Sequence, residues 1–349
     1  MSQQNENNRR TEIDGLRSLA MIGVLYVHFW DKDPITESIR VSLFFVVSGF
    51  LITHILMTAR QRGGHIKVLN FYVRRGLRLF PALWIAVTVA YAFDMDGFRG
   101  NWLWHALQFS NLYYVLTESW DPWMFSHLWS LNLLEQFYLV WPLVVLFLSR
   151  MYVFIIASLS LLICVYIHFF GANHGFNGWW RNIFFVYDPI ATGVLTYLIF
   201  QSGKCLSSVS SRLTLLLAII LLSSPYFVGN EFGQSPTYRL LTLPALGVIV
   251  LGAWNGFGGI IGRALGGREA VLVSKISYGV YIYHFPLWWI TAQYFPQLWQ
   301  PGPTTFVVMT GLSALVATFS WILIERPVSA LKKRFPTFVS SKSEDRHET

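Results

Sequence analysis

Apolar segments of about 20 residues, long enough to cross a bilayer as helices, recur along the whole chain between short polar stretches. They predict ten spans, at about residues 14–31, 38–59, 77–94, 127–148, 151–170, 182–200, 212–228, 239–256, 276–293 and 304–324. The aromatic-rich segment 95–126 is the longest between two spans, and it predicts a short interfacial or re-entrant helix near 101–116. We therefore expect an all-α, polytopic membrane protein.

The composition agrees with this expectation. Of the 349 residues, 54% are hydrophobic and 13% are charged, and the charged fraction of an ordinary soluble domain is about twice as large. Tryptophan clusters near the ends of the spans, such as Trp179 and Trp180, suit the headgroup region of a bilayer. The lipid bilayer is therefore the first partner that the sequence predicts.

The net charge of +8 is sorted among the polar connections. Basic residues crowd alternate connections, around 60–78, 204–212 and 263–275, and the C-terminal segment, whereas the intervening connections hold few. Because cytoplasmic loops are rich in Lys and Arg, this sorting predicts ten crossings with both termini in the cytoplasm. It also explains the positive charge without nucleic acid, which we exclude as a partner.

The chain divides into a polar N-terminal tail, one transmembrane domain and a basic, polar cytoplasmic tail, at 1–10, 11–327 and 328–349. No cleavable signal peptide is evident, because the first apolar segment contains Arg17 and lacks a small-residue cleavage site. Cys164 falls in an apolar run and Cys205 in a polar connection, which argues against a disulfide framework or zinc site. We predict no metal site and no permanently bound cofactor.

The first apolar segment, DGLRSLAMIGVLYVHFW, contains two ionisable residues, Arg17 and His28. Each costs a few kcal/mol to bury in a bilayer, so both need a reason. Eleven residues at about 100° per residue place them on one helix face, about 16 Å apart along the axis. A neutral imidazole accepts a proton from a hydroxyl near pH 7, which makes His28 a candidate general base. For Arg17, which Asp14 is placed to orient, a snorkelling cation near the membrane edge is an equally good interpretation.

Three arginines crowd the start of the third predicted span, in FYVRRGLRLFP. Guanidinium groups bind phosphates through paired hydrogen bonds, so Arg74, Arg75 and Arg78 are candidates for binding a phosphorylated ligand. For two of these three arginines, a role in fixing the membrane orientation or in contacting anionic lipid is an equally good interpretation. Because Arg75 and Arg78 share a helix face, the ligand interpretation is favoured for that pair.

The fourth predicted span, in SHLWSLNLLEQFYLVWP, contains Glu135. A carboxylate at membrane depth needs a partner. Glu135 is either a structural pair with a buried Arg, His or Tyr or a catalytic group, and both interpretations stay open. His127, about two turns earlier, is expected near the outer surface, where interfacial histidines are common.

Small and polar residues interrupt two further spans. Close helix packing explains Ser48 and Gly49 in SLFFVVSGFLI, and Ser48 joins the catalytic candidates only through its context. In the ninth span, Tyr278, Tyr281 and His284 recur at every third position, and packing with hydrogen bonding is the default there. The stretch HFWDKD, at 28–33, fits an H-x4-D acyltransferase pattern by spacing only.

These segments together resemble the membrane-bound acyltransferase-3 family. The shared motifs extend over about residues 11–327, in order, and as a set they are specific. They are Arg17-x10-His28, FFVVSGFLI, Arg75-x2-Arg78, SHLWSL-x3-Glu135-Gln-Phe-Tyr-x3-Pro, SYGVYIYHFPL and Glu325-Arg326-Pro327.

The resemblance implies a multi-pass O-acyltransferase of the bacterial inner membrane that moves an acyl group, often acetyl, onto a hydroxyl. It implies cytoplasmic acyl-CoA as the donor substrate and acceptors such as O-antigen, exopolysaccharide, peptidoglycan, lipochitooligosaccharides or macrolides. By position, His28 would be the catalytic base, and Arg17, Arg75 and Arg78 would help to hold the donor. Some relatives append an extracytoplasmic SGNH domain, which we do not expect in this chain.

The mechanism has one main variant and the function has two rivals. Either the acceptor oxygen attacks the thioester directly, with His28 as base, or an acyl-His28 intermediate forms first. A glycolipid or anion transporter, or a flippase, would use the same buried charges as a proton or anion path. A non-catalytic partner of a glycan-assembly complex is a weaker third reading. The acceptor and the oligomeric state have no recognisable signal in the sequence.

Overall fold

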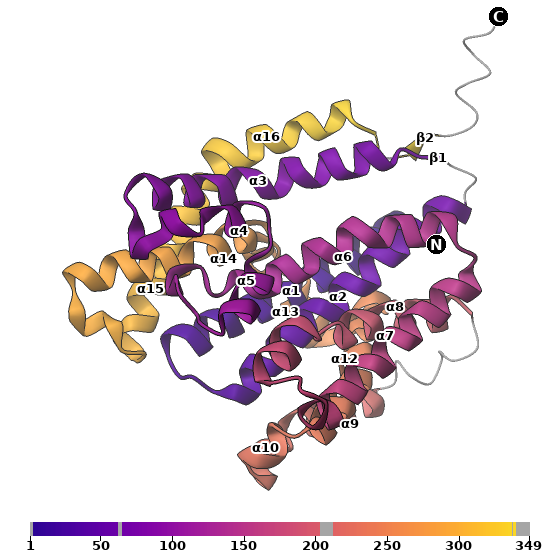
Figure 1. Ribbon diagram of the computed structural model, residues 1–349. Helices are drawn as coiled ribbons and strands as arrows, with labels where there is room; N and C mark the ends of the chain where they lie inside the picture. The colour runs from indigo at the N-terminus through magenta and orange to yellow at the C-terminus, as the bar shows by residue number, and fades with distance from the viewer. Residues whose placement is uncertain (1–2, 62–64, 203–211, 337, 340–349) are drawn as a thin grey trace, which may run out of the picture.

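The computed structural model describes residues 3–61, 65–202, 212–336 and 338–339, which form a bundle of helices (Figure 1). The predicted tails lie partly outside the described residues, as does the connection that holds Lys204 and Cys205. Strand pairing within the described residues is limited to a two-residue antiparallel ladder between β1 (His65–Ile66) and β2 (Phe338–Val339). The all-α prediction is therefore confirmed.

Ten helices overlap the ten predicted spans, one helix for each span. They are α1 (Gln3–Phe29), α2 (Pro34–Gln61), α3 (Val68–Ala92), α6 (Leu128–Phe147), α7 (Arg150–Phe170), α8 (Asp188–Gln201), α9 (Arg212–Ser223), α12 (Pro236–Asn255), α14 (Arg268–Tyr294) and α15 (Pro303–Ser320).

Short helices occupy the connections, and the turns labelled η are 3₁₀-helical or, in η4 and η6, π-helical. They are η1 (Met95–Gly100), α4 (Trp102–Ala106), α5 (Ser110–Thr117), η2 (Trp123–Phe125), η3 (Gly171–His174), η4 (Trp180–Phe184), α10 (Pro225–Val228), α11 (Asn230–Gly233), α13 (Gly259–Leu265), η5 (Pro296–Trp299), η6 (Trp321–Glu325), α16 (Arg326–Ala330) and η7 (Leu331–Arg334).

Several predicted boundaries differ from the observed ones. Helix α8 has 14 residues, shorter than the roughly 20 residues that cross a bilayer, and the described part of α9 ends at Ser223, before the predicted residue 228. A proline explains each limit: Pro189 stands in the first turn of α8, and Pro225 follows α9. Between residues 101 and 116 the structure has two short helices, α4 and α5, where one was predicted.

By length and composition, five stretches of the described chain are long and apolar enough to cross a membrane. They are Pro34–Gln61, Leu128–Phe147, Arg150–His174, Pro236–Asn255 and Pro303–Arg334. The multi-pass character of the protein is thus confirmed, and the number of ten crossings stays a prediction.

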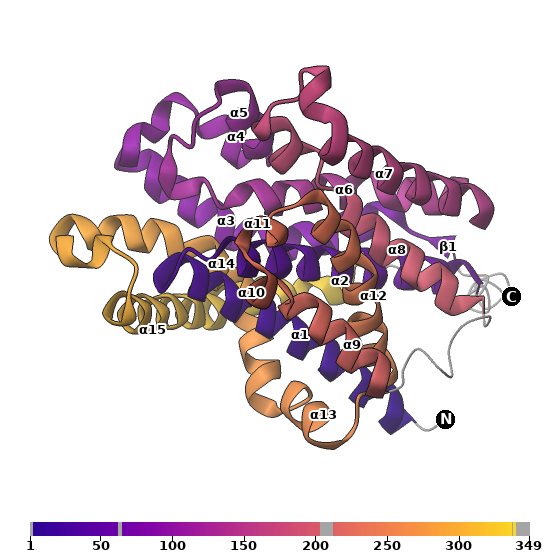
Figure 2. The same cartoon turned by 90° about the horizontal axis from the view of Figure 1, so that it is seen from below.

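Helices α1 and α2 lie inside the bundle, with α14 and α15 on one side and α8 on the other (Figures 1 and 2). Glycine brings α2 and α8 into close contact. A Cβ atom at Gly49 would lie 2.2 Å from the Ile190 carbonyl oxygen, and one at Gly193 would lie 2.1 Å from the Val46 carbonyl oxygen. Small residues allow such backbone contact between membrane helices. The packing interpretation of Gly49 is therefore confirmed.

Both predicted tails begin as regular structure. Helix α1 starts at Gln3, and α16 with η7 continues the chain beyond residue 327, alongside α3 (Figure 1). The Asn70 amide donates to the Pro336 carbonyl at 2.9 Å. The start of α1 and β2 lie at the same end of the bundle (Figure 1).

Candidate active site

A cavity of about 200 Å³ lies between α1, α2, α3, α6 and α14. Most of its wall is apolar, and its polar lining comes from residues far apart in the sequence. These are Arg17, Arg40, Ser48, Arg75, Arg78, Ser130, Glu135, Tyr138, Ser277, Tyr278 and Tyr281. Five of the predicted site residues are among them: Arg17, Ser48, Arg75, Arg78 and Glu135. His28 and Arg74 lie outside this wall.

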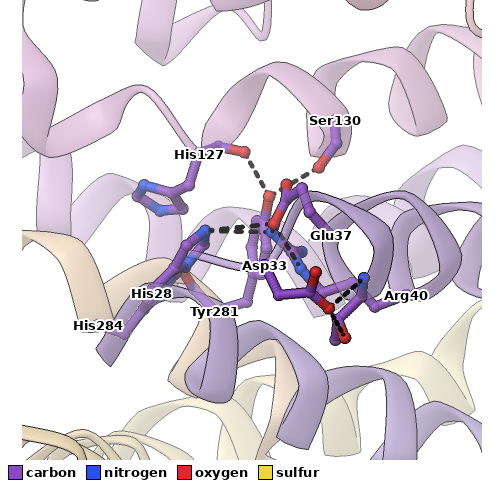
Figure 3. Close-up of polar contacts among 9 residues, drawn as sticks. His28, Asp33, Glu37, Arg40, His127, Ser130, Tyr281 and His284 are labelled. Carbon is purple, nitrogen blue, oxygen red and sulfur yellow. Dashed lines mark hydrogen bonds and ion pairs between the residues drawn. The ribbon is translucent and has the colours of Figure 1, made fainter. Parts of the chain in front are cut away.

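His28, in the last turn of α1, does not line the cavity but contacts Arg40, which does (Figure 3). Its Nδ1 atom is 2.9 Å from Nε2 of His284, and the two rings stack with their centroids 5.1 Å apart. Its Nε2 atom is 3.1 Å from an Nη2 nitrogen of Arg40. The structure thus brings together two histidines from the first and ninth predicted spans.

The hydrogen bonds around the two rings fix their tautomers. Nδ1 of His284 lies 2.7 Å from the Tyr281 carbonyl, which only accepts, so this nitrogen carries a hydrogen. In the neutral ring, Nε2 of His284 is then an acceptor, and Nδ1 of His28 donates to it. The lone pair of His28 is therefore on Nε2, the atom that faces Arg40. This is the tautomer that a general base at Nε2 requires.

Arg40 also belongs to the candidate site, but it was not predicted from the sequence. At the edge of a predicted span, an arginine is typical of a charge that only fixes the membrane orientation. The Arg40 side chain is 6% exposed, and Glu37, one helical turn earlier, accepts from its Nε at 2.9 Å and from Nη2. The Glu37 side chain is 35% exposed, so the ion pair stands between the cavity and the surface. The spacing Glu37-x2-Arg40 at a helix start was the available signal.

A second set of polar contacts joins α6 to α14. The Ser130 hydroxyl lies 2.7 Å from the Tyr281 hydroxyl, which donates to the His127 carbonyl (Figure 3). His127, predicted near the outer surface of the membrane, is buried within the protein: the residue is 4% exposed, and its ring lies 4.8 Å from that of His284. Its depth in the membrane stays a prediction. Packing against the histidine pair accounts for its burial.

Asp33, the partner suggested by the H-x4-D spacing, does not contact His28. Its carboxylate caps α2, accepting from the Thr36 amide at 2.9 Å, and it also accepts from the hydroxyls of Thr36 and Tyr226 at 2.5 Å each. Burial acts to raise the pKa of Asp33, but the hydrogen bonds from Thr36 and Tyr226 outweigh it and hold the pKa below its usual value. Asp33 is thus a structural cap.

Glu135 pairs with Arg75. Two parallel hydrogen bonds of 2.9 Å join the carboxylate to Nε and Nη2 of the guanidinium, which also lies 3.1 Å from the ring centre of Tyr138. This geometry supports the structural interpretation of Glu135. It also means that the charge of Arg75 is already matched.

Arg78 and Arg17 are the cations available in the same part of the cavity wall. In the part of the chain that the structure describes, no hydrogen bond or ion pair engages the Arg78 guanidinium, and the charge of Arg17 repels it. Arg17 lies 3.6 Å from Asp14, which also accepts from Ser274 at 3.2 Å. An anion entering here would relieve the repulsion between the two arginines.

Two other predicted site residues lie apart from this chemistry. Arg74 turns to the C-terminal segment, where it donates to the carbonyls of Lys332 at 2.7 Å and Phe335 at 3.4 Å. Ser48 is 8% exposed and lines the cavity, and among the described residues no base contacts its hydroxyl. In this structure Ser48 is therefore part of the cavity wall, and its hydroxyl is not activated as a nucleophile.

The sequence profile of the family described as acyltransferase domain matches residues 10–325 of this chain. The chain belongs to this family. The resemblance to the acyltransferase-3 family drawn from separate motifs is therefore confirmed. The matched region takes up most of the chain and includes all of these motifs up to Glu325.

Among curated proteins, the sequence relatives described next are named O-acetyltransferases. The chain is 26% identical over 364 aligned positions to O-acetyltransferase OatA of Staphylococcus aureus (strain NCTC 8325 / PS 47), with 93% of the chain and 58% of that protein covered. It is 26% identical to peptidoglycan O-acetyltransferase OatA of Listeria monocytogenes, with 90% and 55% covered. It is 24% identical to the putative peptidoglycan O-acetyltransferase YrhL of Bacillus subtilis, with 90% and 54% covered. The chain thus spans little more than half the length of these relatives. No solved structure matches it.

Proposed function

We propose that this protein is a membrane O-acyltransferase that moves an acyl group, acetyl in the first instance, from acyl-CoA to a hydroxyl of a cell-surface glycan. The observation that carries the proposal is one cavity with two chemically different ends. One end holds the guanidinium of Arg78 beside Arg17, and no described residue forms a hydrogen bond or ion pair with that Arg78 guanidinium. The other end reaches Arg40, which contacts the base nitrogen of His28. The acyltransferase domain and the names of the relatives support the reaction class.

The donor would enter at the arginine end. Phosphate groups of CoA would bind Arg78 and Arg17, which have no matching charge as close as that of Arg75. The thioester arm would extend along the apolar wall of the cavity toward Arg40. Eleven residues of helix separate Arg17 from His28, a reach of about 16 Å.

His28 would act as the general base at the other end. Its Nε2 takes the proton of the acceptor hydroxyl while the hydroxyl oxygen attacks the thioester carbon. His284 holds the ring in the required tautomer, a positioning role. A buried site excludes water and so limits hydrolysis of the donor. Peptidoglycan is the first acceptor to test, because two relatives carry it in their names.

The deciding experiment compares cells that carry the intact gene, no gene, or His28→Ala at equal protein level. Mass spectrometry of surface glycans should detect an ester-linked acyl group only with the intact protein. Ester formation that persists with His28→Ala would exclude His28 as the base. Esters that are equal in all three strains, together with no binding of acyl-CoA by the purified protein, would favour a transporter instead.

The donor end is tested with two neighbouring arginines. Arg78→Ala should raise the KM for acyl-CoA about tenfold or more, since a charge-assisted contact to phosphate is worth about 1.5–3 kcal/mol. Arg74→Ala is the matched control, because Arg74 binds main-chain carbonyls outside the cavity. Equal KM values for the two variants would remove Arg78 from the donor site.

A further inference from the structure

The geometry points to Arg40 as the catalytic group that stabilises the oxyanion formed during acyl transfer, with Glu37 and Gly23 positioning it. This inference rests on the proposed function, since it needs a thioester at the His28 end of the cavity. It gives a chemical role to a buried cation that the proposed base and donor site leave unused.

Arg40 is the one residue that both lines the cavity and contacts the base nitrogen of His28, within the described part of the chain. Its Nη2 atom is 3.1 Å from Nε2 of His28. A hydroxyl that gives its proton to Nε2 must displace this contact and would then lie against the guanidinium. The thioester carbonyl carbon bonds to this hydroxyl oxygen, so it would also lie close to the Arg40 guanidinium.

The Arg40 guanidinium is held in place by Glu37, but not all of its N–H donors are engaged. Glu37 accepts from Nε and Nη2 through one carboxylate oxygen, and no described residue hydrogen-bonds to Nη1. A surface charge that serves only topology would extend into water, whereas the Arg40 side chain is 6% exposed. A preorganised donor in a buried cavity is the arrangement that stabilises developing negative charge.

Gly23 of α1 makes room for the stem of Arg40. A Cβ atom at Gly23 would lie 3.2 Å from Cβ of Arg40 and 3.7 Å from its Cδ. Gly23 also lies on the helix that carries His28, so the base and the guanidinium are positioned against the same helix. A methyl group there would shift the guanidinium without changing any charge.

The reaction step balances as follows. The hydroxyl oxygen forms a bond to the thioester carbon, its proton moves to Nε2 of His28, and the carbonyl electron pair moves to the carbonyl oxygen. That oxyanion accepts hydrogen bonds from Arg40. When it collapses, the carbon–sulfur bond breaks and the thiolate leaves with the proton from His28. The products are the ester and free CoA.

The test measures acyl transfer by membranes that contain the protein, with labelled acetyl-CoA as donor and soluble peptidoglycan fragments as acceptor. If these fragments are not acylated, the hydroxyl-bearing glycan found by the mass-spectrometric comparison replaces them. Arg40→Gln should lower kcat by about 10²–10³, the usual loss for one oxyanion donor, with the KM for acetyl-CoA little changed. The matched control is Arg60→Gln, on the same helix, whose guanidinium binds the carbonyls of Val145 and Leu148 away from the cavity. This control should keep its kcat within about twofold.

Chemical rescue distinguishes a catalytic guanidinium from a merely structural one. In Arg40→Ala, added methylguanidinium should restore turnover at least tenfold, while equal ionic strength from sodium chloride should not. Gly23→Ala should lower kcat with Arg40 still present, and methylguanidinium should not rescue that variant. A rescue that fails in a well-folded Arg40→Ala protein would overturn the assignment.

The outcomes separate this inference from the proposed function. If His28→Ala abolishes transfer and Arg40→Gln keeps its kcat, then the oxyanion role is wrong and the base stands. If His28→Ala retains transfer, then the proposed function fails at its base, whatever Arg40 does.

Discussion

The arginines of the cavity wall differ in what they can still bind. Arg75 is matched by Glu135, and the sequence could predict both residues because an ionisable group inside an apolar run needs a reason. It could not predict that they pair, since they stand on different helices 60 residues apart. Arg78 has the same sequence signal and, among described residues, no such pair. Only the three-dimensional structure, which places Glu135 of α6 beside Arg75 of α3, distinguishes the two.

Loss of one partner from the Arg75–Glu135 pair should destabilise the protein. Arg75→Met leaves a buried carboxylate without its counter-charge, which costs about 3–5 kcal/mol. Glu135→Met combined with Arg75→Met removes both charges and should recover most of that loss. Unfolding of the purified variants in detergent measures both effects. A double variant as unstable as the single one would show that the pair does more than match charge.

Asp33 gives a pH-dependent contribution to stability. Its pKa in the folded protein is lowered, so its contribution is fully present above the unfolded pKa of about 3.9 and is lost as the pH falls through the folded pKa. Tyr226→Phe removes one hydrogen bond to the carboxylate and should cost about 1 kcal/mol at pH 7, because Asp33 is only partly buried.

The melting temperature of Tyr226→Phe, measured from pH 7 to pH 3, checks this contribution. The difference from the unaltered protein should shrink as the pH falls below the unfolded pKa of about 3.9 and through the lowered pKa of Asp33 in the folded protein. Tyr294→Phe serves as control, because Tyr294 is 77% exposed. A Tyr226→Phe difference that is constant with pH would mean that Asp33 is not involved.

At the scale of elements, the sequence predicts which helices exist, but it does not predict where each helix begins and ends. Long apolar runs located every major helix, but Pro189 and Pro225 shorten two of them. Arg40 shows the same limit at a helix start: within the predicted edge of a span it reads as an exposed charge. Its burial depends on Gly23 of the neighbouring helix, a contact that one sequence does not reveal.

The contact between α2 and α8 should tolerate no added methyl group. Gly193→Ala places a Cβ atom 2.1 Å from a carbonyl oxygen of α2, so the two helices must move apart. We expect a loss of roughly 1–3 kcal/mol, the usual cost of overpacking, measured by unfolding in detergent. Gly311→Ala is the matched control, because nothing lies within 4 Å of its added Cβ and alanine favours a helix. Equal stability of the two variants would contradict the close contact.

At the scale of the whole molecule, the sorted charges predict an orientation. The connection that holds Glu118 should face outside, and the one that holds Arg263 should face the cytoplasm. In a protein without its native cysteines, Glu118→Cys should react with a membrane-impermeant maleimide on intact cells. Arg263→Cys should react only after the cells are permeabilised. Labelling of both on intact cells would require a different number of crossings.

The histidine pair ends on the main-chain carbonyl of Tyr281, which does not accept a proton. A proton taken up by His28 therefore has no path through His284 to the far side of the bundle. In the proposed reaction, it returns to the thiolate that leaves the same cavity. Acyl transfer would thus take up or release no free proton on either side of the bilayer and move no net charge across it. Collapse of the proton-motive force should therefore leave its rate unchanged, whereas a proton-coupled carrier would slow.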